Sequence, residues 1–227
     1  MQQALPQISF SPYVILIEDD NGMSKSIEFL LDVEKIKCIH FADGYDFIEA
    51  IKKDSKILEG PGCIFLDVRM PKMNGVEVFD KLNAKFPDLP MPVVFMTGHG
   101  DVPLVIKVLK EGAFDFIQKP FPAKNLLERL SRYFQESINR KVVLVQKTDF
   151  HKKFETLTEK ERQVLGLLYE GMSNKQVAEL MNNSIRTIEL RRAAIYDKMD
   201  VKSTVDLARL LQSVNWAKSD SDSGSHQ

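Results

Sequence analysis

The chain has 227 residues, a length that suits one or two domains of about 150 residues. Hydrophobic residues make up 44% and charged residues 28%, an ordinary composition for a globular protein. Residues 1–140 carry 17 Lys and Arg against 20 Asp and Glu, whereas residues 141–227 carry 14 against 12. This uneven split is a mild indication that the C-terminal part meets nucleic acid.

Several classes of protein are excluded by what the chain lacks. Its two cysteines, Cys38 and Cys63, are too few for a disulfide framework or a zinc site, and their apolar surroundings predict core residues. The N-terminal MQQALPQISFSPY has neither the basic nor the apolar region of a signal peptide. No apolar run approaches the roughly 20 residues that span a bilayer, so we expect a cytoplasmic protein without a membrane segment.

Short apolar runs recur through the first half of the chain. They are Val14–Ile17, Cys38–Phe41, Cys63–Leu66, Val93–Met96 and Phe114–Ile117. Runs of this length suit strands that are buried between helices. The segments between them have a helical period, as in the stripe of Met23, Ile27, Leu30 and Leu31. Five strands alternating with five helices predict an α/β domain with a parallel, doubly wound sheet.

The pattern changes after a long helix that we expect from Ala123 to about Ile138. Residues 139–154 are predicted to be a linker, and residues 155–214 a small all-α domain of four helices. Start signals support these helices: capping boxes at Thr158 and Ser173, and N-caps at Ser184 and Ser203. Gly171 stands where a C-terminal cap would end the first of them. Residues 215–227 are expected to be a disordered tail, because Ser219 to Gln227 is rich in Ser, Asp and Gly.

Polar residues follow four of the five predicted strands. Glu18-Asp19-Asp20 follows the first, Asp67 the third, Thr97 the fourth and Lys119 the fifth. Each of these alone is more often part of a solvated loop. The carboxyl ends of neighbouring parallel strands meet at one edge of the sheet, however, and ligands bind there. Their coincidence at four strand ends therefore predicts a functional site.

Carboxylates brought together in this way need a partner. Two of them about 4 Å apart repel by about 4 kcal/mol at an effective dielectric of about 20. Mg²⁺ would relieve the repulsion, since it prefers oxygen ligands and leaves room for water and a phosphoryl group. Lys119 and Thr97 can then meet phosphoryl oxygens, and an aspartate beside the metal can act as the nucleophile that forms an acyl phosphate.

These motifs make residues 12–138 similar to a response-regulator receiver domain, which has a flavodoxin-like fold. The motifs are LIEDD at 16–20, FLDVRMPKMNG at 65–75, MTGHGD at 96–101 and FDFIQKPF at 114–121. The resemblance implies that Asp67 is the phosphoacceptor and that Mg²⁺ is held by Glu18, Asp19, Asp67 and the backbone carbonyl of Arg69. It also implies phosphoryl contacts from Thr97 and Lys119, a switch aromatic at Phe116 and a cis Lys119–Pro120 peptide. Glu18 departs from the family, in which Asp is commoner.

Enzyme classes fit less well. Phosphatases of the haloacid-dehalogenase type also use a strand-end Asp, but they place a second Asp two residues later, where this chain has Arg69. No Gly-rich turn follows the first strand, which argues against dinucleotide binding. Because a positioned acid/base partner is missing, we expect no turnover enzyme, only slow loss of the domain's own phosphoryl group.

The C-terminal helices match the requirements of a helix-turn-helix. A helix from Ser173 to Met181, a turn at Asn182-Asn183 and a helix from Ser184 to Met199 would place the second helix in a major groove. The expected core positions are Val177, Leu180, Met181, Ile188, Ile195 and Met199. The opposite surface shows Arg186, Glu189, Leu190, Arg191, Arg192 and Lys198. On composition alone, such a surface is more often simply a solvated helix face.

Residues 157–210 resemble the LuxR/FixJ-type DNA-binding domain. The matching segments are LTEKERQVLGLLYEGMSNKQVAELM and SIRTIELRRAAIYDKM. By this resemblance, base edges are met by Glu189, Leu190, Arg192 and Ala193, and phosphates by Lys175, Arg186, Arg191 and Lys198. Glu189 could accept from cytosine N4 and Arg192 could pair with guanine. Arg191 stands where the family often has His, and Asn183 stands where an apolar residue usually packs, which is expected to loosen the turn.

Together the two resemblances imply a phosphorylation-dependent transcriptional regulator of a two-component system. Its expected partners are a sensor histidine kinase, double-stranded promoter DNA, RNA polymerase and a second copy of the chain, with the helix from Ser203 to Gln212 part core and part dimer contact. Phosphorylation would shift the population of receiver conformations by moving Thr97 and Phe116, and the altered surface would either favour receiver dimers or release the DNA-binding domain. A regulator that works unphosphorylated, through a partner protein or constitutive dimers, is an alternative. It is disfavoured because the set of Glu18, Asp19, Asp67, Thr97 and Lys119 is complete. RNA binding is disfavoured by the absence of a stacking platform.

Overall fold

The computed structural model describes residues 11–98 and 102–216. The chain divides into two compact units, of which the first ends at Lys141 and the second begins at Val142. Among the helices described, none is both long and apolar enough to cross a membrane. The last three residues of the MTGHGD motif and the Ser/Asp/Gly-rich end of the chain lie outside the described residues.

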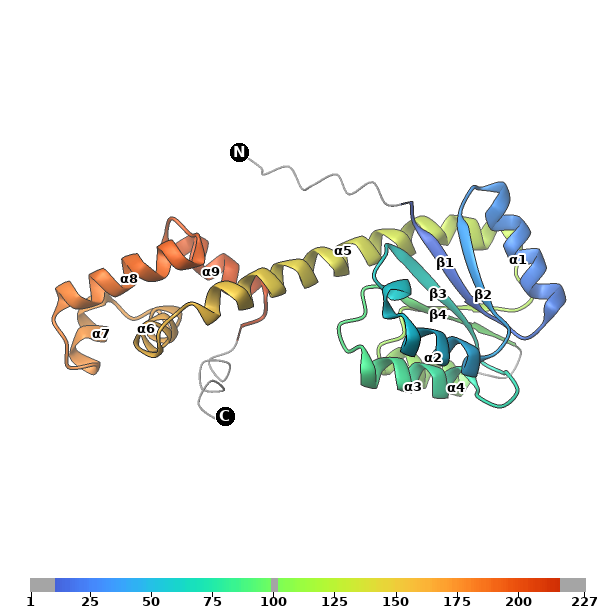
Figure 1. The fold of residues 1–227 in the computed structure, drawn as a ribbon, viewed down its shortest axis with the longest axis horizontal. Helices are drawn as coiled ribbons and strands as arrows, with labels where there is room; N and C mark the ends of the chain where they lie inside the picture. Colours follow the sequence, from blue (N-terminus) through green and yellow to red (C-terminus); the bar gives the residue numbers. More distant parts are fainter. Residues whose placement is uncertain (1–10, 99–101, 217–227) are drawn as a thin grey trace. The chain divides into compact units, whose positions relative to one another are not determined.

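The first unit is built on a five-stranded parallel sheet in the order β2-β1-β3-β4-β5 (Figure 1). The strands are β1 (Tyr13–Ile17), β2 (Lys37–Phe41), β3 (Gly62–Asp67), β4 (Val93–Thr97) and β5 (Asp115–Gln118). Each predicted apolar run overlaps one of them. The register sets Ile17 beside Leu66 and Asp67 beside Met96, so the ends of β1, β3 and β4 lie next to one another. The predicted doubly wound α/β fold is confirmed.

Helices cover both faces of this sheet (Figure 1). They are α1 (Asn21–Val33), α2 (Gly44–Lys53), the 3₁₀ turn η1 (Ser55–Leu58), α3 (Gly75–Lys85), α4 (Val102–Lys110) and α5 (Ala123–Glu155). α1 and α5 pack on the face that carries Val14 and Phe65, while α2, α3 and α4 pack on the face that carries Ile15 and Leu66. Cys63 is buried and Cys38 half-buried on the α1/α5 face, as core residues.

Helix α5 is longer than we predicted. It continues past Ile138 to Glu155, and the division between the two units falls inside it. Residues 139–155 contain no proline or glycine to end a helix, and i,i+4 pairs such as Arg140 with Glu136 and Lys153 with Asp149 support it. The predicted linker at 139–154 is therefore helical.

The second unit adds four shorter helices. They are α6 (Glu159–Tyr169), α7 (Asn174–Leu180), α8 (Ile185–Met199) and α9 (Thr204–Ser213). Their common core includes Phe150 and Phe154 from the end of α5, and Trp216 beyond α9. The structure thus packs into this core residues that we had assigned to the linker and to the tail, and the boundaries at 155 and 214 remain predictions.

The predicted caps of these helices are present. Thr158 and Ser173 form capping boxes with Glu161 and Gln176, and Ser184 and Ser203 cap α8 and α9.

One expected core residue is wrong. Leu180 is 64% exposed, because the buried stripe of the short helix α7 runs through Val177 and Ala178 and continues to Met181.

Candidate functional site

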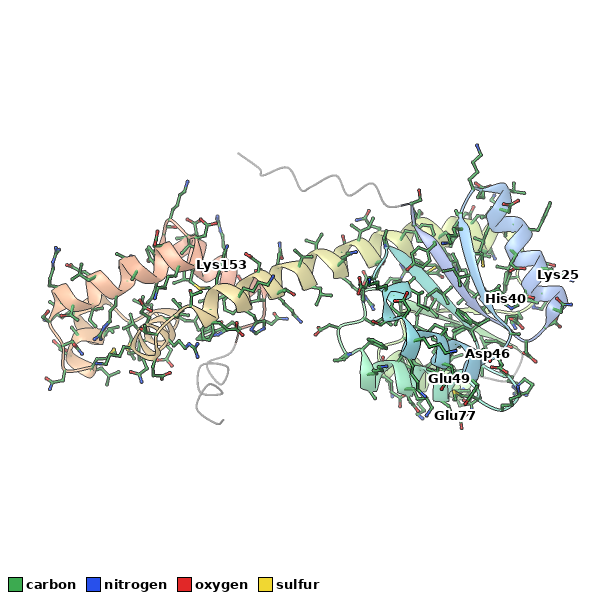
Figure 2. The ribbon with its side chains drawn as sticks, in the orientation of Figure 1. Lys25, His40, Asp46, Glu49, Glu77 and Lys153 are labelled. Atoms are coloured by element: carbon green, nitrogen blue, oxygen red, sulfur yellow. The ribbon has the colours of Figure 1, made fainter. Side chains whose placement is uncertain are left out.

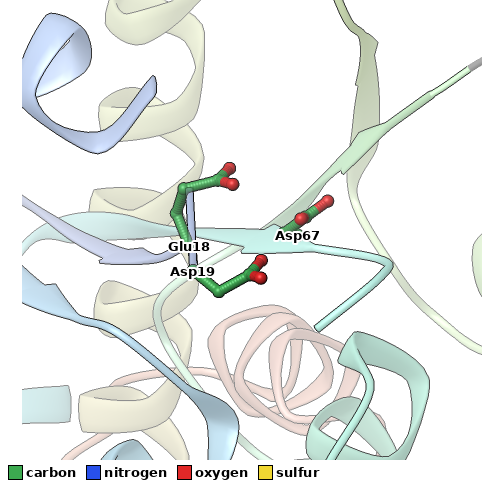
Figure 3. A group of neighbouring side chains, drawn as sticks. All are labelled: Glu18, Asp19 and Asp67. Carbon is green, nitrogen blue, oxygen red and sulfur yellow. The ribbon is translucent and has the colours of Figure 1, made fainter. Parts of the chain in front are cut away.

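Three carboxylates gather at the carboxyl edge of the sheet. Glu18 and Asp19 follow β1 and Asp67 ends β3, and one oxygen of each lies within 4.8 Å of the others (Figure 3). Glu18 is 1% exposed and Asp67 is 7% exposed. The adjacency of β1 and β3 therefore brings together acids that are 48 positions apart in the chain, as their places at the strand ends predicted.

Lys119 joins this cluster from the far edge of the sheet. Its Nζ lies 2.6 Å from Glu18 Oε2 and 3.1 Å from Asp67 Oδ1. Its backbone N–H donates to the carbonyl of Thr97 over 2.7 Å, which fastens the β5 end to the β4 end. Thr97 is itself buried at 3% exposure. The Lys119–Pro120 peptide is cis, as the resemblance implied.

The carboxylates lie in an environment that disfavours their charge. Burial raises the pKa of Glu18, and the Lys119 ammonium opposes this only in part. Burial likewise raises the pKa of Asp67, against the attraction of Lys119. A cluster of hard oxygen donors that is short of positive charge suits Mg²⁺, and the residues present fit this ion. The further ligand predicted at the Arg69 carbonyl stays a prediction.

The loop from β3 to α3 is packed closely against Asp67. A Cβ on Gly75 would lie 2.1 Å from the backbone oxygen of Asp67, so only glycine fits there. Gly75 N–H also donates to Val68 O over 3.0 Å. Asn74 caps α3 in a capping box with Glu77. The MNG part of the sequence motif therefore serves to close this loop over the end of β3.

Two neighbours of the cluster have roles that the sequence did not reveal. Asp20, the third acid of its run, caps α1 by accepting from the backbone N–H groups of Gly22 and Met23 at 2.7 and 2.8 Å. His40, near the end of β2 (Figure 2), donates from Nε2 to the backbone carbonyl of Glu18 over 2.9 Å. No motif marks His40, because its neighbours in the run Cys38–Phe41 are apolar.

Among the described residues, a cleft of about 760 Å³ borders Asp19 and is lined by the β3–α3 loop and by Leu104 of α4. Phe116 on β5 is 36% exposed, so its ring is not packed into the core. Its role as a switch stays a prediction.

The residues of the second unit that we predicted to contact DNA differ in how exposed they are. Arg186 and Glu189 project from α8 with side chains 80% and 49% exposed, and Leu190 is 58% exposed. Ala193 and Lys175 are also exposed, while Arg191 is half-buried.

Arg192 and Lys198 are engaged inside the unit. Arg192 donates to Tyr196, Asn174 and Thr204, and Lys198 lies 2.7 Å from an oxygen of the buried Glu161.

The turn between α7 and α8 is closed by its two asparagines. Asn182 adopts a left-handed conformation with φ of 50°, which Asn tolerates better than most residues. Asn183, which we expected to loosen the turn, donates from Nδ2 to the carbonyl of Met181 over 2.6 Å. Its backbone N–H also donates to Ala178 O over 2.9 Å, so Asn183 fastens the turn.

Comparison with known families assigns both units. Residues 14–131 match the family model "Response regulator receiver domain", and residues 155–211 match "Bacterial regulatory proteins, luxR family". The chain is a two-component response regulator. It belongs to the group with a LuxR-type helix-turn-helix and thus to DNA-binding transcriptional regulators, which are not enzymes.

Whole-length relatives agree with this response-regulator assignment. The transcriptional regulatory protein FixJ of Bradyrhizobium diazoefficiens is 36% identical over 201 residues, which cover 87% of this chain and 93% of FixJ. The tetrathionate response regulatory protein TtrR of Salmonella typhimurium is 35% identical, over 86% of this chain and 89% of TtrR. The solved structure of response regulator StyR, 30% identical, superposes with a TM-score of 0.69 over 89% of this chain and 99% of StyR.

Proposed function

We propose that this response regulator takes a phosphoryl group onto Asp67 from a sensor histidine kinase and that the modified protein binds promoter DNA through α8. The observation that carries the proposal is the convergence of three carboxylates and Lys119 at one sheet edge, beside an open cleft. The cleft is where a donor imidazole would approach Asp67.

The transfer itself follows from the groups present. An Asp67 carboxylate oxygen attacks phosphorus, the new O–P bond forms as the N–P bond of the donor phosphohistidine breaks, and the histidine nitrogen takes a proton from solvent. Glu18, Asp19, Asp67 and the Arg69 carbonyl would hold Mg²⁺, which would supply positive charge to the phosphoryl oxygens. Lys119 releases Asp67 and meets a phosphoryl oxygen, and the Thr97 hydroxyl meets another.

Phosphorylation affects the DNA-binding unit by shifting the population of receiver conformations. Movement of Thr97 toward the phosphoryl group opens space into which Phe116 turns, and this changes the surface formed by α4 and β5. That surface then favours a dimer, which places two copies of α8 on two half-sites. RNA polymerase is the expected partner at the promoter.

The DNA contacts divide by exposure and charge. Base edges are met by Glu189, Leu190 and Ala193, which are exposed on α8. Phosphates are met by Lys175, Arg186 and Arg191, which fix register. These residues present the functional groups that groove contacts require, an acceptor and apolar surface for bases and cations for phosphates.

The test is the affinity for promoter DNA at fixed salt, with and without Mg²⁺ plus beryllofluoride, for wild type and Asp67→Asn. Salt is held constant because phosphate contacts make affinity steeply salt-dependent. We expect beryllofluoride to tighten wild-type binding on the order of tenfold or more, which is the usual size of an allosteric coupling. Asp67→Asn should not respond.

Two results would contradict parts of the proposal. Equal binding by both proteins under every condition would leave a DNA-binding protein that Asp67 does not control. A beryllofluoride response that survives in Asp67→Asn would mean that the phosphoryl group is accepted elsewhere.

A further inference from the structure

Arg192 has a different environment from the exposed residues around it on α8. Its guanidinium uses three nitrogens at once: Nε donates to Tyr196 Oη over 2.8 Å, NH1 to Asn174 Oδ1 over 3.2 Å and NH2 to Thr204 Oγ1 over 2.8 Å. The group also stacks on the Tyr196 ring, 5.1 Å from its centroid. The side chain is half-buried as a result.

The three partners belong to three different helices. Tyr196 lies one turn along α8, Asn174 is the first residue of α7, and Thr204 is the first residue of α9. The hydroxyls of Tyr196 and Thr204 also lie 2.7 Å apart, which closes the network. Arg192 therefore ties the N-terminal ends of α7 and α9 to the middle of the DNA-facing helix.

This arrangement competes with base recognition. Pairing with guanine requires two guanidinium N–H groups directed into the groove, whereas in Arg192 each of the three nitrogens donates within the unit. These three bonds use three of the five N–H donors and hold the plane of the group against Tyr196, Asn174 and Thr204. Arg186 on the same helix provides the contrast, since its side chain is 80% exposed.

We propose that Arg192 is a positioning residue and does not read a base. It holds α7 and α9 in place and so fixes how α8 presents Glu189, Leu190 and Ala193 to the groove. This inference deepens the proposed function and rests on it. The exposed positions of α8 then determine the DNA-sequence specificity, and Arg192 does not make the guanine contact that we had expected.

The test starts from DNA selected by the wild-type full chain, with Mg²⁺ and beryllofluoride, from a pool of random-sequence duplexes. Affinities for the selected duplex and for its single-base-pair variants are then measured for Arg192→Met and Thr204→Val. Arg186→Met is the matched control, because it removes the same charge from an exposed position of the same helix.

We expect Arg192→Met and Thr204→Val each to lower affinity by about three- to tenfold for every duplex alike, the size of a lost hydrogen-bond network. The ranking of base pairs should not change. The double variant should lose little more than either single one, because both remove the same network. The slope of affinity against salt should stay at the wild-type value in Arg192→Met and fall by roughly one unit in Arg186→Met.

Other outcomes overturn the inference. Relaxed preference at one base pair in Arg192→Met, with no effect of Thr204→Val, would make Arg192 a base reader. A reduced salt slope in Arg192→Met would make it a phosphate contact. Should Arg192→Met fail to fold, as judged by the fluorescence of Trp216, the sole tryptophan, then Thr204→Val and Tyr196→Phe decide, since they leave the guanidinium in place. Unchanged affinity in both would refute the positioning role.

Failure of the proposed function gives a different pattern. A wild-type protein that selects no sequence from the pool lacks sequence-specific DNA binding, whatever its variants do. A wild-type protein that selects the same sequence equally well without beryllofluoride lacks phosphorylation control, and the test of Arg192 still proceeds.

Discussion

The charged residues of the two units were predicted from similar patterns but have different environments. At the sheet edge, Lys119 contacts both Glu18 and Asp67. On α8, Arg186 is exposed whereas Arg192 is hydrogen-bonded within the unit. A parallel sheet forces its strand ends together, so a charge at a strand end has its neighbours determined by topology. A helix surface imposes no such convergence. A cation there can either bind a partner molecule or form hydrogen bonds within its own unit.

The largest change that we expect is in the rate of phosphoryl uptake when Lys119 is replaced. Lys119→Met should lower the rate of phosphoryl uptake from a small acyl phosphate, with Mg²⁺ present, by about 10²-fold, because it removes a positive charge aimed at the transferring group. The measurement is the fraction of phosphorylated protein against time.

Lys124→Met is the control for this experiment. Its side chain is 84% exposed and pairs with Glu128 on the surface, so uptake should remain at the wild-type rate. Equal rates in wild type and Lys119→Met would show that the sheet-edge lysine has only a structural role. The view that topology brings the strand-end charges together for phosphoryl transfer would then be wrong.

An intermediate effect is expected at Glu161. This carboxylate is 7% exposed, lies 2.7 Å from Lys198 Nζ and closes the cap of α6. Glu161→Gln should lower the free energy of unfolding of the second unit by about 1–2 kcal/mol, less than for a fully buried pair because Lys198 is partly exposed. Urea denaturation followed by the fluorescence of Trp216 measures it.

The stability that the Glu161–Lys198 pair contributes should also depend on pH. Burial tends to raise the pKa of Glu161, but the hydrogen bonds from Lys198 and Thr158 outweigh it and hold the pKa below the usual 4.5. A carboxyl with a lowered folded pKa contributes its full stability above its unfolded pKa, and this contribution disappears as the pH falls through the folded pKa. The difference between wild type and Glu161→Gln should therefore be constant near pH 7 and shrink below about pH 4.5. A difference that grows on acidification would contradict the assignment.

The smallest effect is expected at Ser137 in the first unit. Its buried hydroxyl accepts from the Gly62 N–H over 3.1 Å and links α5 to the start of β3. Ser137→Ala leaves that N–H without its partner and should cost about 1 kcal/mol. Faster hydrogen exchange at the Gly62 amide is the local measurement. Ser131→Ala, an exposed position on the same helix, should leave that amide unchanged.

Most of the first unit was predictable because its signals are local. A run of four apolar residues identifies a buried strand, and strands alternating with helices dictate a parallel sheet. The strand ends then predicted the acid cluster without any contact information. The end of α5 was missed because a mixed charged segment suggested a linker, whereas the absence of Pro and Gly was the better signal.

In the second unit the caps and the turn were predictable, but the use of individual side chains was not. Leu180 was predicted as core from its periodicity, yet the buried stripe of a seven-residue helix is too narrow to include it. Phe150 and Trp216 gave no sign that they join the same core, since they flank the predicted domain on opposite sides.

The fold class, the order of the elements and the residue types at the strand ends could be predicted from the chain alone, because backbone preference and hydrophobic period depend on neighbouring residues. Which polar atoms meet depends on tertiary packing. The contact of Lys119 with Glu18 joins residues 101 positions apart, and those of Arg192 with Asn174 and Thr204 join residues 18 and 12 positions apart. Such contacts depend on how helices and strands pack. Side chains of the same type can therefore bind a ligand, position a helix or stabilise the fold, depending on which groups they contact.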